Sequence, residues 1–142
     1  SSLLRSSRMT ATPVQATISL RALVPRSDDN SLLVVKRSSD GVWELPGGRL
    51  GRDETLIQGL KREVLEETNQ TISIDEPLHT AAWQNERKKY RVGIFYRGSL
   101  AVRRDVELSS EHSDAAWLHP KHAADRLETP GQEAIERFGN RR

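Results

Sequence analysis

The chain of 142 residues contains no cysteine and a single methionine, Met9. The lack of cysteine excludes disulfide bonds and thiolate chemistry. There is also no apolar run near the roughly 20 residues that a membrane-spanning helix needs. Hydrophobic residues make up 35% of the chain, which is modest but compatible with one globular domain that buries a core. We therefore expect a cytoplasmic protein that does not enter a membrane.

The N-terminal stretch SSLLRSSRMTATP lacks acidic residues and is rich in serine, threonine and arginine. We interpret residues 1–8, up to the only methionine, as a vector-derived leader, and a basic transit segment is the alternative. Without Arg5 and Arg8 the formal net charge falls from +2 to 0. Charge therefore does not favour nucleic acid as a partner. The sequence predicts a flexible segment over residues 1–12 and a single domain over residues 13–142.

Strand and helix patterns are mixed along the chain. Strands are predicted at Val14–Val24, Ser31–Arg37, Thr71–Asn85 with a break at Pro77, Lys89–Val102 and Ala115–Pro120, with a short strand and a glycine-rich loop within Val42–Thr55. Helices are predicted at Glu54–Thr68, briefly from Pro120, and at Thr129–Gly139. Asp53 is expected as an N-terminal cap or first-turn acid, Thr129 as an N-terminal cap, and Asn69 and Gly139 as C-terminal caps. This mixture predicts an α/β or α+β layered domain.

The first predicted helix crowds three carboxylates, Glu63, Glu66 and Glu67, near its C-terminal end. Like charges at these spacings repel, and the helix dipole favours cations there. At about 100° per residue, Glu67 falls within the apolar stripe around Leu60, whereas Arg62 points nearly the opposite way. A carboxylate that faces apolar surroundings is costly unless it is paired or bound to metal. The segment is therefore either a solvated acidic face or a site for a hard cation such as Mg²⁺.

The spacing Gly48, five residues, Glu54, seven residues and then REVLEETNQ resembles the Nudix box of the Nudix hydrolases. The matching positions are Gly48, Glu54, Arg62, Glu63, Val64, Glu66 and Glu67. Asn69 stands where the family has glycine, and asparagine is the best substitute at a left-handed position. Gln70 stands where the family has a bulky aliphatic residue, a function that Ile72 can take over. The segments WELPGG and SSEHSDAAWL are also similar to family segments.

The resemblance implies a Nudix-type α/β/α sandwich, with a mixed β-sheet and the box as a loop–helix–loop. It implies Mg²⁺-dependent hydrolysis of a diphosphate linkage in a nucleotide, and Mn²⁺ often substitutes. A nucleoside triphosphate or its oxidised form, cleaved to release pyrophosphate, is the favoured substrate. ADP-ribose, nucleotide sugars and dinucleoside polyphosphates remain alternatives. A nucleotide-binding Nudix module without turnover is the alternative from another class, and a homodimer is compatible with the family.

The family pattern also implies functions for individual residues. The metal ligands are expected to be the carboxylates of Glu63, Glu66 and Glu67, with the carbonyl of Gly48. Arg62 is expected to orient a glutamate, and Glu54 is its structural partner or an outer contributor to the metal site. The expected catalytic residues are Glu66, Glu63, Arg62 and Glu111. Of these, Glu66 is the one whose loss should harm turnover most, and Glu111 is the candidate for a general base outside the box.

Three residues besides the matching positions of the box are candidates for substrate contacts. Arg49 could meet a phosphate, with ordinary surface charge as the alternative. Trp83 and Tyr90 could stack on a nucleobase, with core or edge packing as the alternative. Trp43 and Trp117 are interpreted as core residues.

Overall fold

The computed structural model describes residues 11–140. The expected leader over residues 1–8 and nearly all of the expected flexible segment therefore lie outside the described residues. The strands are β1 (Ala16–Leu23), β2 (Leu32–Arg37), β3 (Trp43–Glu44), β4 (Gly47–Arg49), β5 (Ile72–Gln84), β6 (Tyr90–Leu100) and β7 (His112–Leu118). The helices are α2 (Leu56–Thr68), α3 (Pro120–Arg126) and α4 (Thr129–Asn140). No helix in this range is long and apolar enough to cross a membrane.

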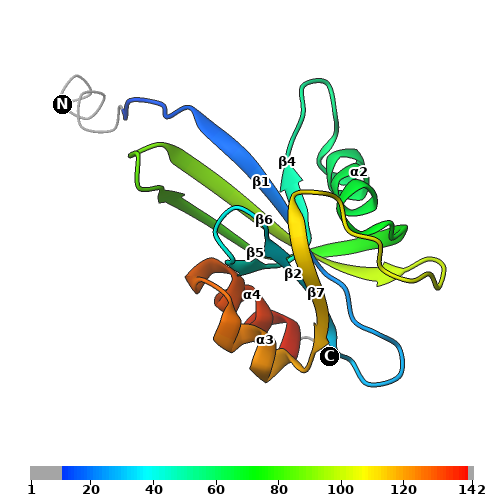
Figure 1. Cartoon of the computed structure of the whole chain (residues 1–142). Coiled ribbons are helices and arrows are strands. Elements are labelled where there is room, and N and C mark those ends of the chain that lie inside the picture. Colours follow the sequence, from blue (N-terminus) through cyan, green and yellow to red (C-terminus); the bar gives the residue numbers. More distant parts are fainter. Residues whose placement is uncertain (1–10, 141–142) are drawn as a thin grey trace.

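Two sheets form the framework (Figure 1). The first has the strand order β4-β1-β6-β5, and it is mixed because β1 runs parallel to β6 while the outer pairs are antiparallel. The second has the order β3-β2-β7 and is antiparallel. The expectation of a mixed sheet combined with helices is confirmed, and the separate small sheet adds a layer that the sequence pattern did not indicate.

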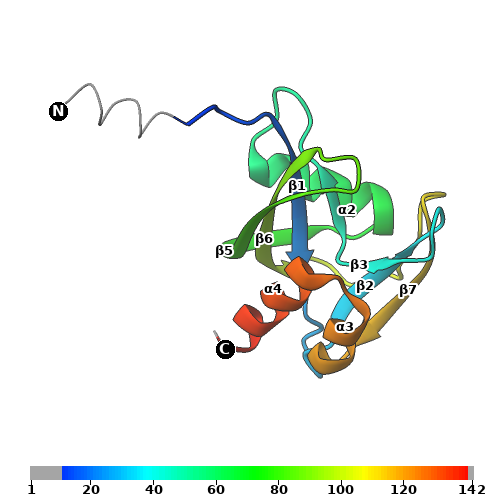
Figure 2. The same ribbon diagram turned by 90° about the vertical axis from the view of Figure 1, so that its left-hand side faces the viewer.

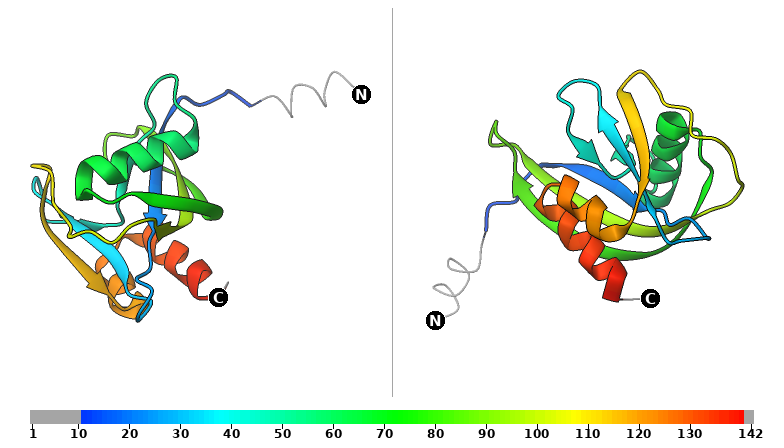
Figure 3. Two further views of the ribbon diagram at one scale, coloured as in Figure 1. Left: turned by 90° about the vertical axis from the view of Figure 1, so that its right-hand side faces the viewer. Right: turned by 60° about the horizontal axis from the view of Figure 1, so that its bottom comes forward.

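The mixed sheet has a buried core on each face because successive strand residues point to opposite sides. On one face, Leu20 of β1 packs with Leu60 of α2. On the other face, Phe95 of β6 packs in a cluster that contains Phe138 of α4 and Val34 of β2. Helix α2 and the α3–α4 pair therefore lie on opposite sides of β1 and β6 (Figures 2 and 3). This layering confirms the α/β/α sandwich.

The ends of α2 correct one cap and confirm the other. The helix begins after Thr55, whose side chain accepts a hydrogen bond from the backbone of Gln58 at 3.1 Å, while the Gln58 side chain accepts from the backbone of Thr55 at 3.0 Å. This reciprocal capping box satisfies two free N–H groups. The prediction of Asp53 as the cap or as a first-turn acid was therefore wrong, since Thr55 caps the helix and its first turn contains no acidic residue. Asn69 ends the helix at φ 59° and ψ 28°, as predicted.

Two further boundaries differ from the predictions. Strand β5 continues through Pro77 without a break, with register shifts on both sides of that residue. It can do so because β5 is the outermost strand of its sheet, where a missing N–H and a bulge are tolerated. Helix α4 includes both Thr129 and Gly139, so neither is an end cap as predicted. The partly buried Trp43 and Trp117 pack against the core clusters, as expected.

Candidate active site in the loop–helix segment of α2

Arg62 organises the acidic end of α2. Its Nε and Nη2 atoms donate to the two oxygens of Glu54 at 2.6 and 2.8 Å, a two-point contact with a planar carboxylate. Glu54 also accepts a hydrogen bond from the backbone of Gly51 at 2.7 Å. The hydrogen bond from Arg62, above all, holds the pKa of Glu54 below its usual value. Arg62 is thereby fixed from the loop that precedes the helix.

The same guanidinium contacts two of the three clustered carboxylates. Arg62 Nη1 donates to Glu63 at 2.9 Å and to the more exposed Glu66 at 3.3 Å. Hydrogen bonds from Arg62 to Glu54 and Glu63 raise the arginine pKa further above its usual value. The repulsion between neighbouring glutamates is thus partly relieved by one cation. Among residues 11–140, Arg62 forms no ion pair with Glu67, in agreement with the helical wheel.

Glu67 lies on the buried side of the helix, and only 4% of the residue is exposed. One carboxylate oxygen accepts a hydrogen bond from the backbone N–H of Gly47 at 3.0 Å. Burial is the largest cause that raises the Glu67 pKa to about 8, against smaller opposing effects from Gly47 and Arg21. A buried carboxylate with so little compensation is a position that favours a bound cation.

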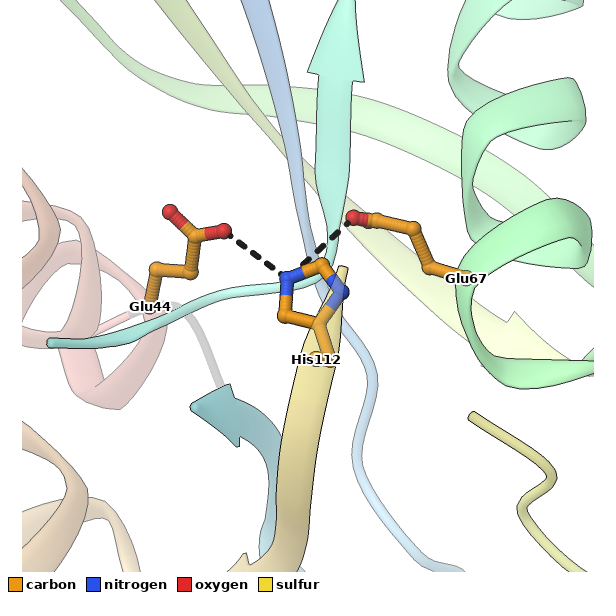
Figure 4. A group of neighbouring side chains, drawn as sticks. All are labelled: Glu44, Glu67 and His112. Atoms are coloured by element: carbon orange, nitrogen blue, oxygen red, sulfur yellow. Dashed lines mark hydrogen bonds and ion pairs between the residues drawn. The ribbon is translucent and has the colours of Figure 1, made fainter. Parts of the chain in front are cut away.

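Glu44 and His112 meet Glu67 from the second sheet (Figure 4). The Nε2 atom of His112 lies 3.0 Å from a Glu44 oxygen and 3.6 Å from a Glu67 oxygen. One potential ligand atom from each of the three residues lies within 4.8 Å of the others. Arg21 Nη1 lies 3.5 Å from the Glu44 oxygen that His112 contacts, and Arg37 Nη1 lies 3.5 Å from the other Glu44 oxygen. The site therefore contains two buried or half-buried acids around one buried imidazole.

The Glu63 side chain packs against the backbone of Gly48. A Cβ atom built on Gly48 would lie 2.3 Å from a carboxylate oxygen of Glu63 and 2.8 Å from its Cγ. The Glu63 side chain therefore rests directly on the backbone of β4, where Gly48 pairs with Leu20 of β1. A side chain at position 48 would occupy the space that this carboxylate now fills.

A cavity of about 1060 Å³ opens beside these groups. Of the site residues expected from the sequence, it is lined by Gly48, Arg49, Glu63, Glu66, Glu67, Trp83 and Glu111. Glu54 and Arg62 do not line the cavity, but Arg62 donates hydrogen bonds to Glu63 and Glu66, which do. Tyr90 is 41% exposed and also lies outside the lining. Glu111 is exposed on the turn before β7, where its carbonyl accepts from the Ser38 backbone at 2.8 Å.

Comparison with known proteins agrees with this geometry. Residues 18–138 match the family model of the NUDIX domain. The chain belongs to the Nudix family. It is 35% identical over 116 residues to a MutT-like protein of Streptomyces ambofaciens, across 81% of this chain and 71% of that protein. It is 26% identical over 109 residues to nucleoside triphosphatase NudI of Escherichia coli O81 (strain ED1a), across 66% of this chain and 77% of that protein.

A solved Nudix-fold structure extends the agreement to three dimensions. The MutT protein from Methanosarcina mazei Go1 superposes with a TM-score of 0.79 and 28% identity, covering 93% of this chain and 100% of that one. The chain is thus a Nudix-type pyrophosphohydrolase, and the Nudix box is the segment from Gly48 to Gln70. Nudix enzymes generally use a divalent metal. The buried Glu67 and the neighbouring carboxylates form an oxygen-rich donor set that fits such an ion.

The sequence reasoning missed Glu44 and His112 as parts of this site. Both stood within segments that resemble the family, WELPGG and SSEHSDAAWL, but neither was assigned a function. The available signal was their presence in those segments next to the expected site residues. Their contact also depends on strand pairing between distant parts of the chain.

Proposed function

We propose that this Nudix enzyme hydrolyses a diphosphate linkage in a nucleoside triphosphate or its oxidised form, with Mg²⁺ as cofactor, in the cytoplasm. The products are a nucleoside monophosphate and pyrophosphate. One observation carries the proposal: the clustered box carboxylates face a cavity that also presents Arg49 and Trp83. Such a cavity offers cation-mediated contacts to phosphates and an aromatic surface for a base. The similarity to a nucleoside triphosphatase supports the same substrate class.

In this proposal, Glu63, Glu66 and Glu67 hold the metal together with the Gly48 carbonyl, and Mn²⁺ can substitute. When bound, the metal neutralises phosphate charge and lowers the pKa of water. Arg62 keeps two of these carboxylates in place through its contacts at 2.9 and 3.3 Å. Those contacts are compatible with a cation because each carboxylate retains a second oxygen.

The reaction joins a water oxygen to phosphorus while the bond from phosphorus to the bridging oxygen breaks. A carboxylate accepts the water proton, and the leaving pyrophosphate takes the bridging oxygen with its electron pair. Glu66 and Glu111 are the two candidates for this base, since both line the cavity and are exposed to it. Glu66 is the first residue to test because it combines this position with the expected metal contact.

Glu66→Gln tests the proposal because it removes the charge while keeping the side-chain shape. Glu136→Gln on α4 is the matched control, since Glu136 is also an exposed helical glutamate but lies outside the cavity. The substrates are nucleoside triphosphates, 8-oxo-dGTP, ADP-ribose, dinucleoside polyphosphates and nucleotide sugars. Each is incubated with Mg²⁺, with Mn²⁺ or with chelator, and products are separated by anion-exchange chromatography.

We expect chelator-sensitive release of pyrophosphate from a triphosphate, reduced about 100-fold or more by Glu66→Gln and unchanged by Glu136→Gln. Cleavage of ADP-ribose or a nucleotide sugar alone would replace the proposed substrate class while keeping the hydrolase. Nucleotide binding without turnover of any compound would favour the non-catalytic module.

A further inference from the structure

Trp83 of β5 lies across a glycine rather than within a core. A Cβ atom built on Gly93 of β6 would lie 2.9 Å from both Cη2 and Cζ3 of the Trp83 indole. It would also lie 3.2 Å from Phe95. The outer edge of the indole therefore rests on the bare backbone of β6. Trp83 is half-buried, belongs to neither core cluster and lines the cavity beside the Nudix box.

The register of the mixed sheet relates this indole to the box. Gly93 pairs with Ser19 of β1, and Ser19 pairs with Arg49 of β4. Two strand spacings amount to about 10 Å. Gly93 has no side chain and that of Ser19 is short, so little side-chain volume covers the sheet between the indole and β4. Ser19 lines the cavity. A sugar and its first phosphate can bridge such a gap toward the carboxylates next to Gly48.

Arg91 stands beside the indole as the cross-strand partner of Trp83. It is half-buried and lines the same cavity. Burial lowers the Arg91 pKa most, and the nearby Arg49 and Arg21 lower it further. Among residues 11–140, no carboxylate forms an ion pair with Arg91. The positive charge of Arg91 therefore favours the binding of an anion from solution.

We propose that the base of the substrate stacks on Trp83, and that Arg91 contacts the phosphate next to the sugar. The proposal rests on the proposed function, since it places the nucleoside monophosphate part of the substrate in the same cavity. Stacking on an aromatic ring accepts any base, so this contact supplies affinity for nucleotides as a class. Gly93 belongs to the subsite because only a residue without a side chain lets the indole lie this close to β6.

The subsite is tested by calorimetric titration of dGMP and of ribose 5-phosphate, which lacks a base, into the wild type and its variants. Trp83→Leu should weaken dGMP binding about 5- to 150-fold and leave ribose 5-phosphate binding unchanged. Trp83→Phe should restore most of the dGMP affinity because it restores an aromatic face. Arg91→Gln should weaken both ligands to a similar extent.

Gly93→Ala and Tyr90→Leu complete the set of variants. Gly93→Ala keeps the indole but displaces it, so it should weaken dGMP binding. A base stacked on Trp83 should quench tryptophan fluorescence when dGMP binds, and Gly93→Ala should reduce this quenching. Tyr90→Leu removes the other aromatic side chain that the sequence offers for stacking on a base. Because Tyr90 is exposed and lies outside the cavity lining, this variant should keep its dGMP affinity, and loss of dGMP binding in Tyr90→Leu but not in Trp83→Leu would overturn the proposal. Circular dichroism spectra and melting temperatures confirm that each variant is folded.

The proposal is overturned if Trp83→Leu binds dGMP as the wild type does, if it loses ribose 5-phosphate equally, or if the wild type binds neither ligand. Failure of the proposed function gives a different result. In that case dGMP still binds through Trp83, but no nucleotide is hydrolysed. Conversely, metal-dependent turnover with the same KM in wild type and Trp83→Leu refutes the subsite and leaves the hydrolase intact.

Discussion

Gly48→Ala separates the geometry of the site from the stability of the fold. The backbone φ of Gly48 lies outside the positive region, so alanine causes no backbone strain there. The new methyl group would instead meet the Glu63 carboxylate carbon at 2.4 Å and its oxygen at 2.3 Å. Comfortable contacts are about 3.5 Å or longer, so the carboxylate must move by roughly 1 Å. That shift removes it from the 2.9 Å contact with Arg62.

The expected energies follow from these contacts. The weakened hydrogen bond costs about 1 kcal/mol because it is partly exposed, and the lower entropy of the unfolded alanine chain offsets about half or more of this. The melting temperature should therefore change by only a few degrees. Metal affinity and turnover should fall roughly 10- to 100-fold, as is usual when a ligand is displaced from its support.

Gly47→Ala, in contrast to Gly48→Ala, should mainly lower the stability of the fold. Its φ is +147°, and a Cβ atom would lie 1.9 Å from the carbonyl oxygen of Leu20 in the neighbouring strand. The backbone pairing of β1 and β4 must then open, which should cost about 2 kcal/mol or more and lower the melting temperature by roughly 6–10 °C. Gly139→Ala, with nothing within 4 Å of the new atom, is the neutral control for glycine replacement.

The assay combines thermal unfolding, calorimetric titration of Mn²⁺ and turnover of the substrate found in the panel. Gly48→Ala should reduce Mn²⁺ affinity and turnover while melting close to the wild type. Wild-type metal affinity and turnover in a folded Gly48→Ala protein would refute the view that metal binding requires Glu63 to pack against the backbone of β4. If Gly48→Ala melted at a temperature as low as Gly47→Ala, this would refute the view that Gly48→Ala changes the site without destabilising the fold.

Two further predictions concern Arg62 and Glu67. Arg62→Lys should raise the half-saturating Mg²⁺ concentration about 10-fold or more, because an ammonium group cannot bind Glu54 and Glu63 together as the planar guanidinium does. Arg137→Lys is the control at an exposed position. The same Mg²⁺ dependence in Arg62→Lys and the wild type would contradict the argument. In chelator, the free energy of unfolding should fall as pH rises from about 5 to 8, because the pKa of Glu67 is raised to about 8 and the folded chain binds more protons than the unfolded chain. Urea unfolding should show a loss on the order of a few kcal/mol that Glu67→Gln removes, and an equal slope in both proteins would show that another group is responsible.

Local patterns were sufficient to predict much of α2. The apolar stripe around Leu60 placed Glu67 on the buried side, and the structure confirms this with an exposure of 4%. The left-handed Asn69 was equally predictable because few residues accept that conformation. The N-terminal cap was wrong because Asp53 and Thr55 are both acceptable capping residues. The hydrogen bonds to Gln58, which decide between them, depend on loop geometry.

The contact between Glu44 and His112 could not be predicted in the same way. The two residues are 68 positions apart, and strand β2 brings them together. One edge of β2 pairs Val35 with Glu44, and the other edge pairs Arg37 with His112. A shift of one residue in either register would turn one of the side chains to the opposite face of the small sheet. The alternation of apolar residues identifies strands, but it does not specify which distant strands pair.

Gln70 shows how a departure from the family pattern can be explained once the structure is known. Gln70 places an amide where the family has an aliphatic residue, and its side chain is fully buried. Its Nε2 atom donates to the carbonyls of Arg104 and Asp105 at 3.1 and 3.2 Å, while Ile72 supplies the apolar contact in the core. The loop that leads to Glu111 is thereby fastened to the end of the Nudix-box helix. An aliphatic side chain at this position has no donor for those carbonyls, so the amide couples the box to the loop that carries the second candidate for the general base.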